Sequence, residues 1–149
     1  MKLCDEEFYF NYISLKTLFI SFDDYKKWLN EIFLRDNSQN EIILKLEWHT
    51  GDLEKTIDEL YIYLYDKLSS LDYHVVAKMI INELKVKYAN NPESLKELTH
   101  KLYDIWNLLP SEIVDKEPFF TLNHIDDPWS WGDEEQVKKS INWLFSYYN

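Results

Sequence analysis

The sequence predicts an all-α fold, a single-domain bundle of six or seven helices that spans residues 1–149. Glycine is nearly absent, with two residues in the chain, and the four prolines all lie in the second half. All-β domains need many turn residues, so this scarcity favours long helices joined by short loops. Apolar residues also recur at helical spacing, and polar capping residues precede several of these stretches. We therefore expect helix in more than half of the residues, above the ~30–35% that is usual in globular proteins.

The predicted bundle is organised around a central buried helix over residues 52–68. One face of this helix carries apolar residues at i, i+4, i+7, i+8, i+11 and i+15, namely Leu53, Ile57, Leu60, Tyr61, Leu64 and Leu68. Ile62, Tyr63 and Tyr65 spread apolar surface around the rest of the circumference. A helix that is apolar nearly all round must be covered on most sides, so other helices should pack around it. A strand is the competing interpretation, because tyrosines alternate with Ile62 and a leucine, but the longer period and the charged residues favour a helix.

Two elements are expected before the short connection to the central helix. Residues 8–20 are the least readable part, and they suggest a short helix over residues 15–19 after an extended or helical arm. Ser21 should cap a second helix that ends near Arg35, because two aspartates fill its first turn and apolar residues recur at helical spacing.

A short third helix should lead into the central one. Ser38 and Glu41 match a capping box, and the helix that they open should end at Trp48 or His49. Gly51 then supplies a residue that tolerates a left-handed C-cap. The aspartate that follows it can cap the central helix.

The helices after the central one are marked by a proline and by a regular stripe. One helix should begin after Ser70 or Asp72 and run to about Ala89, and Asn91 should cap the next, with Pro92 at its first position. The clearest amphipathic stripe of the chain follows, at Leu95, Leu98, Leu102, Ile105, Trp106 and Leu109. Its tryptophan is expected in the core.

Composition excludes several classes of protein. The net charge is −11 and Arg35 is the only arginine, so binding of nucleic acid or of a membrane surface through basic residues is not expected. Cys4 is alone, and the acidic N-terminus lacks the apolar stretch of a secretory signal, which fits a cytoplasmic location. No apolar run approaches the ~18 residues of a membrane span. Abundant Lys, Ile, Asn and Tyr beside scarce Ala, Gly and Arg are typical of a low-GC coding bias, which favours a bacterial origin.

The residues that could carry chemistry form no catalytic or metal-binding motif. The four histidines lack paired helical spacing, and Glu97 with His100 gives a single Glu-x-x-His match where a di-iron bundle needs two. Cys4 has no evident base, and no nucleophile motif is present. We expect no cofactor, no metal and no enzymatic activity. A hydrolase with a carboxylate-lined pocket stays open, because two catalytic carboxylates meet only in space.

Residues 115–132 form the longest irregular stretch and contain the best candidate site. Long loops without secondary structure are uncommon in compact domains and are often functional. The candidate partner-binding residues are Asp126, Asp127, Trp129 and Trp131, with Asp133, the expected cap of the last helix, on the rim. Tryptophans anchor interfaces, and acidic groups match a basic partner. Alternatively, the stretch folds back and plugs the core with its aromatic residues.

In size, charge, helicity and the acidic-aromatic stretch from Asp126 to Trp129, the chain resembles the small immunity proteins of bacterial toxin systems. The resemblance implies a non-enzymatic, cytoplasmic inhibitor that binds a basic protein, such as a toxin nuclease. The alternatives are a helical domain with a structural or housekeeping role, and the hydrolase. The sequence leaves the oligomeric state open.

Overall fold

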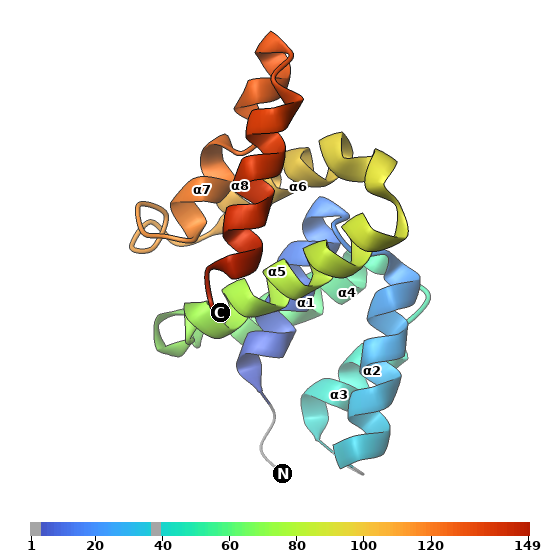
Figure 1. Cartoon of the computed structure of the whole chain (residues 1–149). Helices are drawn as coiled ribbons and strands as arrows, with labels where there is room; N and C mark the ends of the chain where they lie inside the picture. Colours follow the sequence, from blue (N-terminus) through green and yellow to red (C-terminus); the bar gives the residue numbers. More distant parts are fainter. Residues whose placement is uncertain (1–3, 37–39) are drawn as a thin grey trace. The chain divides into compact units, whose positions relative to one another are not determined.

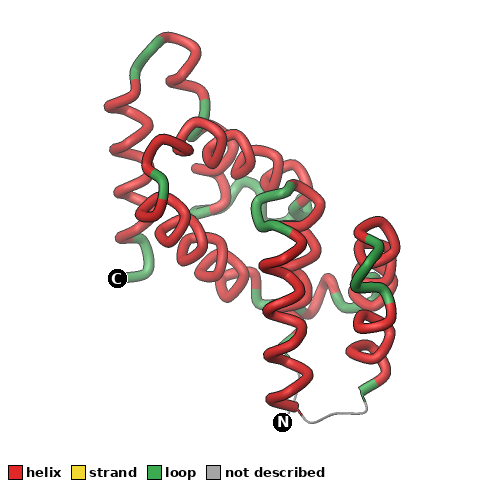
Figure 2. Tube along the Cα trace, turned by 90° about the vertical axis from the view of Figure 1, so that its right-hand side faces the viewer, coloured by secondary structure: helices red, strands yellow, loops and turns green. Residues whose placement is uncertain are grey.

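The computed structural model describes residues 4–36 and 40–149, and within these ranges the protein is all-helical. Helices make up 77% of the described residues, in eight α-helices and three 3-10 helices, and no strand occurs among them (Figure 2). The predicted fold class is confirmed, with eight α-helices in place of six or seven. Contacts divide the chain into two compact units, Met1–Asp72 and Tyr73–Asn149, so the single domain over residues 1–149 stays a prediction.

Among the described residues, the first unit contains four α-helices and a 3-10 turn. They are α1 (Asp5–Thr17), α2 (Phe22–Asp36), α3 (Glu41–Trp48), α4 (Leu53–Leu64) and η1 (Leu68–Ser70). Helix α4 packs on α1 and α3, and α2 packs on the same two helices (Figure 1). Phe8 lies at the centre of their aromatic contacts, with its ring centroid 5.2 Å from that of Trp28 and 5.1 Å from that of Tyr63.

Helix α1 corrects the expectation for the N-terminal residues. A continuous helix of 13 residues replaces the short helix predicted over residues 15–19. Three acidic residues in its first turn stabilise the helix, because their negative charges lie at the positive end of the helix dipole. It ends at Thr17, and the C-cap residue Leu18 is left-handed with a φ of 61°. The predicted cap of α2 is confirmed, because Ser21 Oγ accepts from the backbone N–H of Asp24 at 3.0 Å.

The caps around α3 differ from the prediction at two positions. Ser38 lies outside the described residues, and Asn40 caps α3 by accepting from the backbone N–H of Ile42 at 3.0 Å. The helix ends at Trp48 as predicted. Gly51 is not left-handed, since Gly132 is the one glycine of the described ranges with a positive φ. Asp52 caps α4 as expected, through the backbone N–H of Lys55 at 3.1 Å.

Helix α4 is buried on one face, which corrects the expectation of a helix covered on most sides. Thr56, Leu60 and Leu64 are buried. Tyr61, Ile62 and Tyr65 are exposed, and Ile62 keeps 66% of its surface. The helix also ends at Leu64, before the predicted residue 68.

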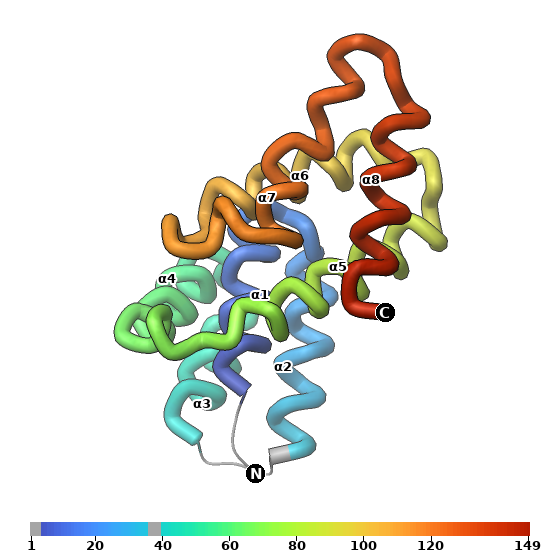
Figure 3. The backbone as a smooth tube through the Cα atoms, turned by 60° about the vertical axis from the view of Figure 1, so that its left-hand side comes forward, coloured from blue at the N-terminus to red at the C-terminus, as the bar shows by residue number. Residues whose placement is uncertain are grey.

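The second unit contains the other four α-helices and two 3-10 helices. They are α5 (Tyr73–Asn90), η2 (Pro92–Ser94), α6 (Leu95–Leu108), α7 (Phe119–His124), η3 (Asp127–Trp131) and α8 (Glu134–Ser146). Helix α6 packs on α5 and α7, and α8 packs on α5 and η3 (Figure 3). Asp133 caps α8 as predicted, by accepting from the backbone N–H of Gln136 at 3.0 Å. None of the helices in the described part of the chain is long and apolar enough to cross a membrane.

The stripe of α6 is confirmed except at its tryptophan. Its leucines and Ile105 are buried. Trp106 is only half-buried at the edge of this stripe, so its predicted place in the core is wrong. Its indole Nε1 donates to the carbonyl oxygen of Val114 at 3.1 Å, which ties the turn after α6 to the helix.

The stretch over residues 115–132 is not the loop that the sequence suggested. It folds into α7 and η3, and its side chains Phe119, Leu122, Ile125 and Pro128 are buried. The segment from α7 to the start of η3 therefore packs into the core, as the alternative interpretation predicted. Its two tryptophans behave differently, because Trp129 is half-buried and Trp131 is exposed.

Candidate functional site

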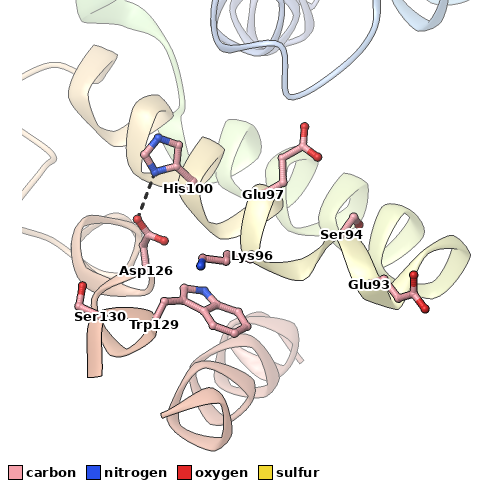
Figure 4. A pocket seen from close by; sticks show the side chains of 8 residues that line it. All are labelled: Glu93, Ser94, Lys96, Glu97, His100, Asp126, Trp129 and Ser130. Atoms are coloured by element: carbon pink, nitrogen blue, oxygen red, sulfur yellow. Dashed lines mark hydrogen bonds and ion pairs between the residues drawn. The ribbon is translucent and has the colours of Figure 1, made fainter. Parts of the chain in front are cut away.

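An open groove of about 610 Å³ lies between the start of α6 and η3 (Figure 4). One wall comes from η2 and α6, with the side chains of Glu93, Ser94, Lys96, Glu97 and His100. The other wall comes from the end of the α7–η3 segment, with Asp126, Trp129 and Ser130. Positions 93, 96, 97 and 100 are spaced i, i+3, i+4 and i+7, which places them on one face of a helical segment.

Thr99 holds Trp129 in this groove. The threonine is fully buried, and its Oγ1 accepts from the indole Nε1 of Trp129 at 2.9 Å. The same hydroxyl donates to the backbone carbonyl oxygen of Lys96 at 3.0 Å, one turn earlier in α6. The polar edge of the indole is thus satisfied, and the ring is fixed as a wall of the groove.

Asp126 and His100 form a pair across the groove. His100 Nδ1 lies 3.3 Å from Asp126 Oδ2, and Figure 4 shows the two side chains pointing toward each other. The carboxylate is 26% exposed, and its second oxygen lies 3.5 Å from Thr99 Oγ1. Asp126 therefore sits at the wall of the groove with Oδ2 beside His100 and one side open to solvent.

Glu97 is directed away from this pair. Its Oε1 accepts from Lys101 Nζ at 2.8 Å, one turn further along α6. This hydrogen bond and the positive charge of Lys101 lower the pKa of the Glu97 carboxyl. A general acid in a two-carboxylate hydrolase needs the opposite, a carboxyl that stays protonated near neutral pH.

The structure brings two of the five predicted site residues together in the groove. Asp126 and Trp129 line it, whereas Asp127, Trp131 and Asp133 lie outside its lining. All three of the latter are exposed, and Trp131 keeps 66% of its surface. Asp133 carries a structural task as well, since it caps α8 and its backbone N–H donates to the carbonyl oxygen of Pro128 at 2.9 Å.

Sequence reasoning missed the contribution of α6 to this site. From the sequence alone, Thr99 is only a polar residue that interrupts the apolar stripe of α6, and Lys96 is only a charged residue exposed to solvent. His100 was considered only as half of a metal motif with Glu97. The signal that could have found them is their common face on α6, but the partner residues lie 26 to 30 positions further along the chain.

Cys4 and the possible metal ligands among the described residues are further candidates for site chemistry. Burial raises the pKa of the Cys4 thiol, so this cysteine is a weaker nucleophile than a free one. No group of three or more His, Cys, Asp and Glu side chains that could hold a metal ion occurs within residues 4–36 and 40–149.

The comparisons with known proteins add no family. The chain matches no protein-family model, no curated protein and no solved structure.

Proposed function

We propose that the chain is a non-enzymatic, protein-binding protein with a basic partner, and that it acts as an immunity-type inhibitor of a bacterial toxin. The proposed binding surface is made of Asp127, Trp131 and Asp133, with the first turn of α8 beside them. We call it the η3–α8 surface.

The observation that carries the proposal is the exposure of Trp131 within an acidic stretch. Residues 126–137 contain five carboxylates, at Asp126, Asp127, Asp133, Glu134 and Glu135, and no lysine or arginine. A tryptophan that keeps 66% of its surface in water leaves a large apolar area uncovered. Tryptophan is enriched among the residues that dominate binding energy, and acidic neighbours select a partner of opposite charge.

The charge of the whole chain supports the same partner. A net charge of −11 attracts a basic protein from a distance and repels nucleic acid. Toxins that cleave nucleic acid have to be basic where they hold their substrate, so an acidic binder can cover that surface.

The hydrolase alternative has one observation in its favour, the pair of His100 and Asp126 in the groove. The groove is open, and Lys101 lowers the pKa of the Glu97 carboxyl, so Glu97 is not suited to act as the acid beside the pair. A structural or housekeeping role makes no use of an exposed Trp131 together with the carboxylates around it, whereas binding uses both. Binding therefore accounts for more of the site.

The test begins with a pulldown from the native host, read by mass spectrometry, and continues with the captured partner in a kinetic binding assay. Trp131→Ala should weaken the complex by about 2 kcal/mol or more, mainly through faster dissociation. Trp48→Ala is the matched control, because Trp48 is 86% exposed on α3 and lies outside the η3–α8 surface.

The acidic residues should act on the association rate instead. Asp127→Asn combined with Asp133→Asn should slow association and flatten its salt dependence, since charge steering is screened over ~10 Å at ~0.1 M salt. Asparagine can still cap α8, so the fold is kept. Asp23→Asn combined with Asp66→Asn changes the net charge equally in the first unit. Equal effects of the two double variants, together with a neutral Trp131→Ala, would refute the η3–α8 surface.

A further inference from the structure

We infer that the groove between α6 and η3 receives an arginine side chain of the basic partner, with its guanidinium against the Trp129 ring and beside Asp126. This inference rests on the proposed function and extends it from a charged surface to one recognised residue type. It assigns a role to the groove, which the η3–α8 surface does not include.

The Trp129 ring already attracts a cation within the chain. Lys96 Nζ lies 5.9 Å from the centroid of the ring, within the ~6 Å over which a cation interacts with an aromatic face. Figure 4 shows the Lys96 side chain between Asp126 and Trp129. Because Thr99 holds the indole by its Nε1, the ring keeps its orientation when the flexible lysine moves away.

The charges of the groove favour an additional cation. Its lining contains three carboxylates, at Glu93, Glu97 and Asp126, of which Glu97 is already paired with Lys101, and a single lysine, Lys96. Lys96 has no carboxylate partner in the described part of the chain, so it does not neutralise any one of them. An ionised carboxylate offers about four acceptor positions, and at Asp126 the contact with His100 Nδ1 at 3.3 Å occupies one of them.

Arginine matches this arrangement better than lysine does. Its planar guanidinium can stack on the indole and donate N–H groups in its plane to a carboxylate at the same time. Lysine offers a compact charge without a plane to stack. The volume of about 610 Å³ and the open mouth leave room for the side chain to enter from solvent.

Lys96 then acts as an internal competitor for the ring. A partner's guanidinium has to displace its ammonium from the face of Trp129. Removing Lys96 should therefore strengthen binding at the groove beyond the effect of one unit of charge. A purely structural role of Lys96 predicts no such gain.

The test uses the full chain, labelled with nitrogen-15, and an acetylated hexa-arginine amide as the probe. The chain has six tryptophans, and the indole N–H resonance of Trp129 is the one lost in Trp129→Phe. Hexa-arginine should shift this resonance in a saturable manner, and hexa-lysine at the same concentrations should shift it less. An unmoved resonance, or an equal shift with hexa-lysine, would overturn the inference.

Two substitutions with matched controls measure the same site. Lys96→Ala should tighten hexa-arginine binding roughly two- to fivefold relative to Lys27→Ala, which removes an exposed lysine from α2. Asp126→Asn should weaken it roughly two- to fivefold relative to Asp58→Asn, an exposed carboxylate on α4. Affinities that match those of the controls would also overturn the inference.

The outcomes separate this inference from the proposed function. If Trp131→Ala loses the captured partner while Lys96→Ala and Asp126→Asn bind it like the wild type, the groove has no role and the η3–α8 surface stands. If the groove variants alter partner binding while the η3–α8 variants do not, the groove stands and the surface fails.

Discussion

Two buried hydroxyl groups, on Tyr25 and Thr99, are in opposite situations. Tyr25 is fully buried in the first unit, and none of the described residues accepts or donates a hydrogen bond at its hydroxyl. Thr99 is equally buried in the second unit, but its hydroxyl bonds to both Trp129 and Lys96. A buried polar group without a hydrogen-bond partner destabilises the folded state. Removing a hydroxyl that has partners is destabilising instead, because it leaves those partners unsatisfied.

Tyr25→Phe should stabilise the protein. The substitution keeps the ring and removes the unpaired hydroxyl, which costs about 1–3 kcal/mol in the folded state. Urea denaturation should show a higher midpoint with an unchanged slope. Tyr63→Phe is the control and should lose about 1 kcal/mol, because the Tyr63 hydroxyl donates to Asp5 Oδ1 at 2.6 Å. A loss of stability in Tyr25→Phe would mean that its hydroxyl has a partner.

Thr99→Val should destabilise the second unit and loosen Trp129. Valine has nearly the same shape but leaves the indole N–H without its acceptor, at a cost of about 1–3 kcal/mol. Thr99→Ser keeps the hydroxyl and should preserve the position of the Trp129 indole N–H resonance. If valine leaves this resonance unchanged and serine moves it, the hydrogen bond is not what holds the ring.

The predictable part of the candidate site is the part encoded within one short segment. Asp126, Trp129 and Trp131 stand out because an acidic and aromatic run is unusual in itself. Thr99 and His100 do not stand out, because their role arises from a contact across 26 to 30 residues of sequence. Side chains that matter only through a distant partner carry no local signal.

At the scale of elements, α4 shows how apolar content and burial differ. The sequence places apolar residues around nearly its whole circumference, but α1 and α3 cover only the face with Thr56, Leu60 and Leu64. Tyrosine rings tolerate water at their polar ends, so Tyr61 and Tyr65 can lie exposed at little cost. Ile62 has no polar group to hydrate, so its exposure leaves an uncovered apolar side chain on the outer face of α4.

Leu60→Ala and Ile62→Ala should differ sharply, although the two residues are neighbours on one helix. Leu60 is fully buried, so its truncation should cost about 2–5 kcal/mol of unfolding free energy. Ile62 is mostly exposed, so its truncation should stay within about 0.5 kcal/mol of the wild type. Urea denaturation of both variants gives the comparison. A large loss in Ile62→Ala would show that the outer face of α4 is covered after all.

Helices with a polar cap and one apolar stripe could be predicted from the sequence, and the others could not. Ser21, Asp52 and Asp133 cap α2, α4 and α8 as expected. The first part of helix α1 was left open between an extended and a helical arm, because aromatic residues at 8, 10 and 12 alternate like a strand and hide its helical period. Helices α7 and η3 were missed because they are too short to show a period and lie next to prolines.

At the scale of the whole molecule, composition predicts the fold class and the charge but not the division of contacts. Two glycines and 27 acidic residues already favour long helices with a negative surface. The division into Met1–Asp72 and Tyr73–Asn149 depends on which faces meet, and apolar stripes alone do not specify their partners. The second unit carries both the groove and the η3–α8 surface, so the proposed binding chemistry lies within it.

Stability should fall steeply in alkaline solution because several tyrosines lie in environments that disfavour their ionised form. Burial raises the pKa of Tyr73 to about 12, with Glu112 adding to the effect. Burial also raises the pKa of Tyr25, with Glu47 nearby, and that of Tyr63, whose hydroxyl is bonded to Asp5. In the unfolded chain these groups ionise near pH ~10.

The sign of the pH dependence follows from proton counts. Below pH ~10 both states hold these protons, and the tyrosines contribute their full stability. Between pH ~10 and the raised pKa values the folded state holds more protons than the unfolded state, so the free energy of unfolding decreases as pH rises. In urea denaturation, these tyrosines should therefore leave the midpoint unchanged from neutral pH to pH ~10 and lower it at higher pH. Tyrosinate absorbance should appear together with the loss of the helical signal. Tyr25→Phe removes the most deeply buried of the three hydroxyls and should make the decline of the midpoint with pH shallower. An identical decline in the variant would show that Tyr25 ionises in the folded protein as it does in the unfolded chain.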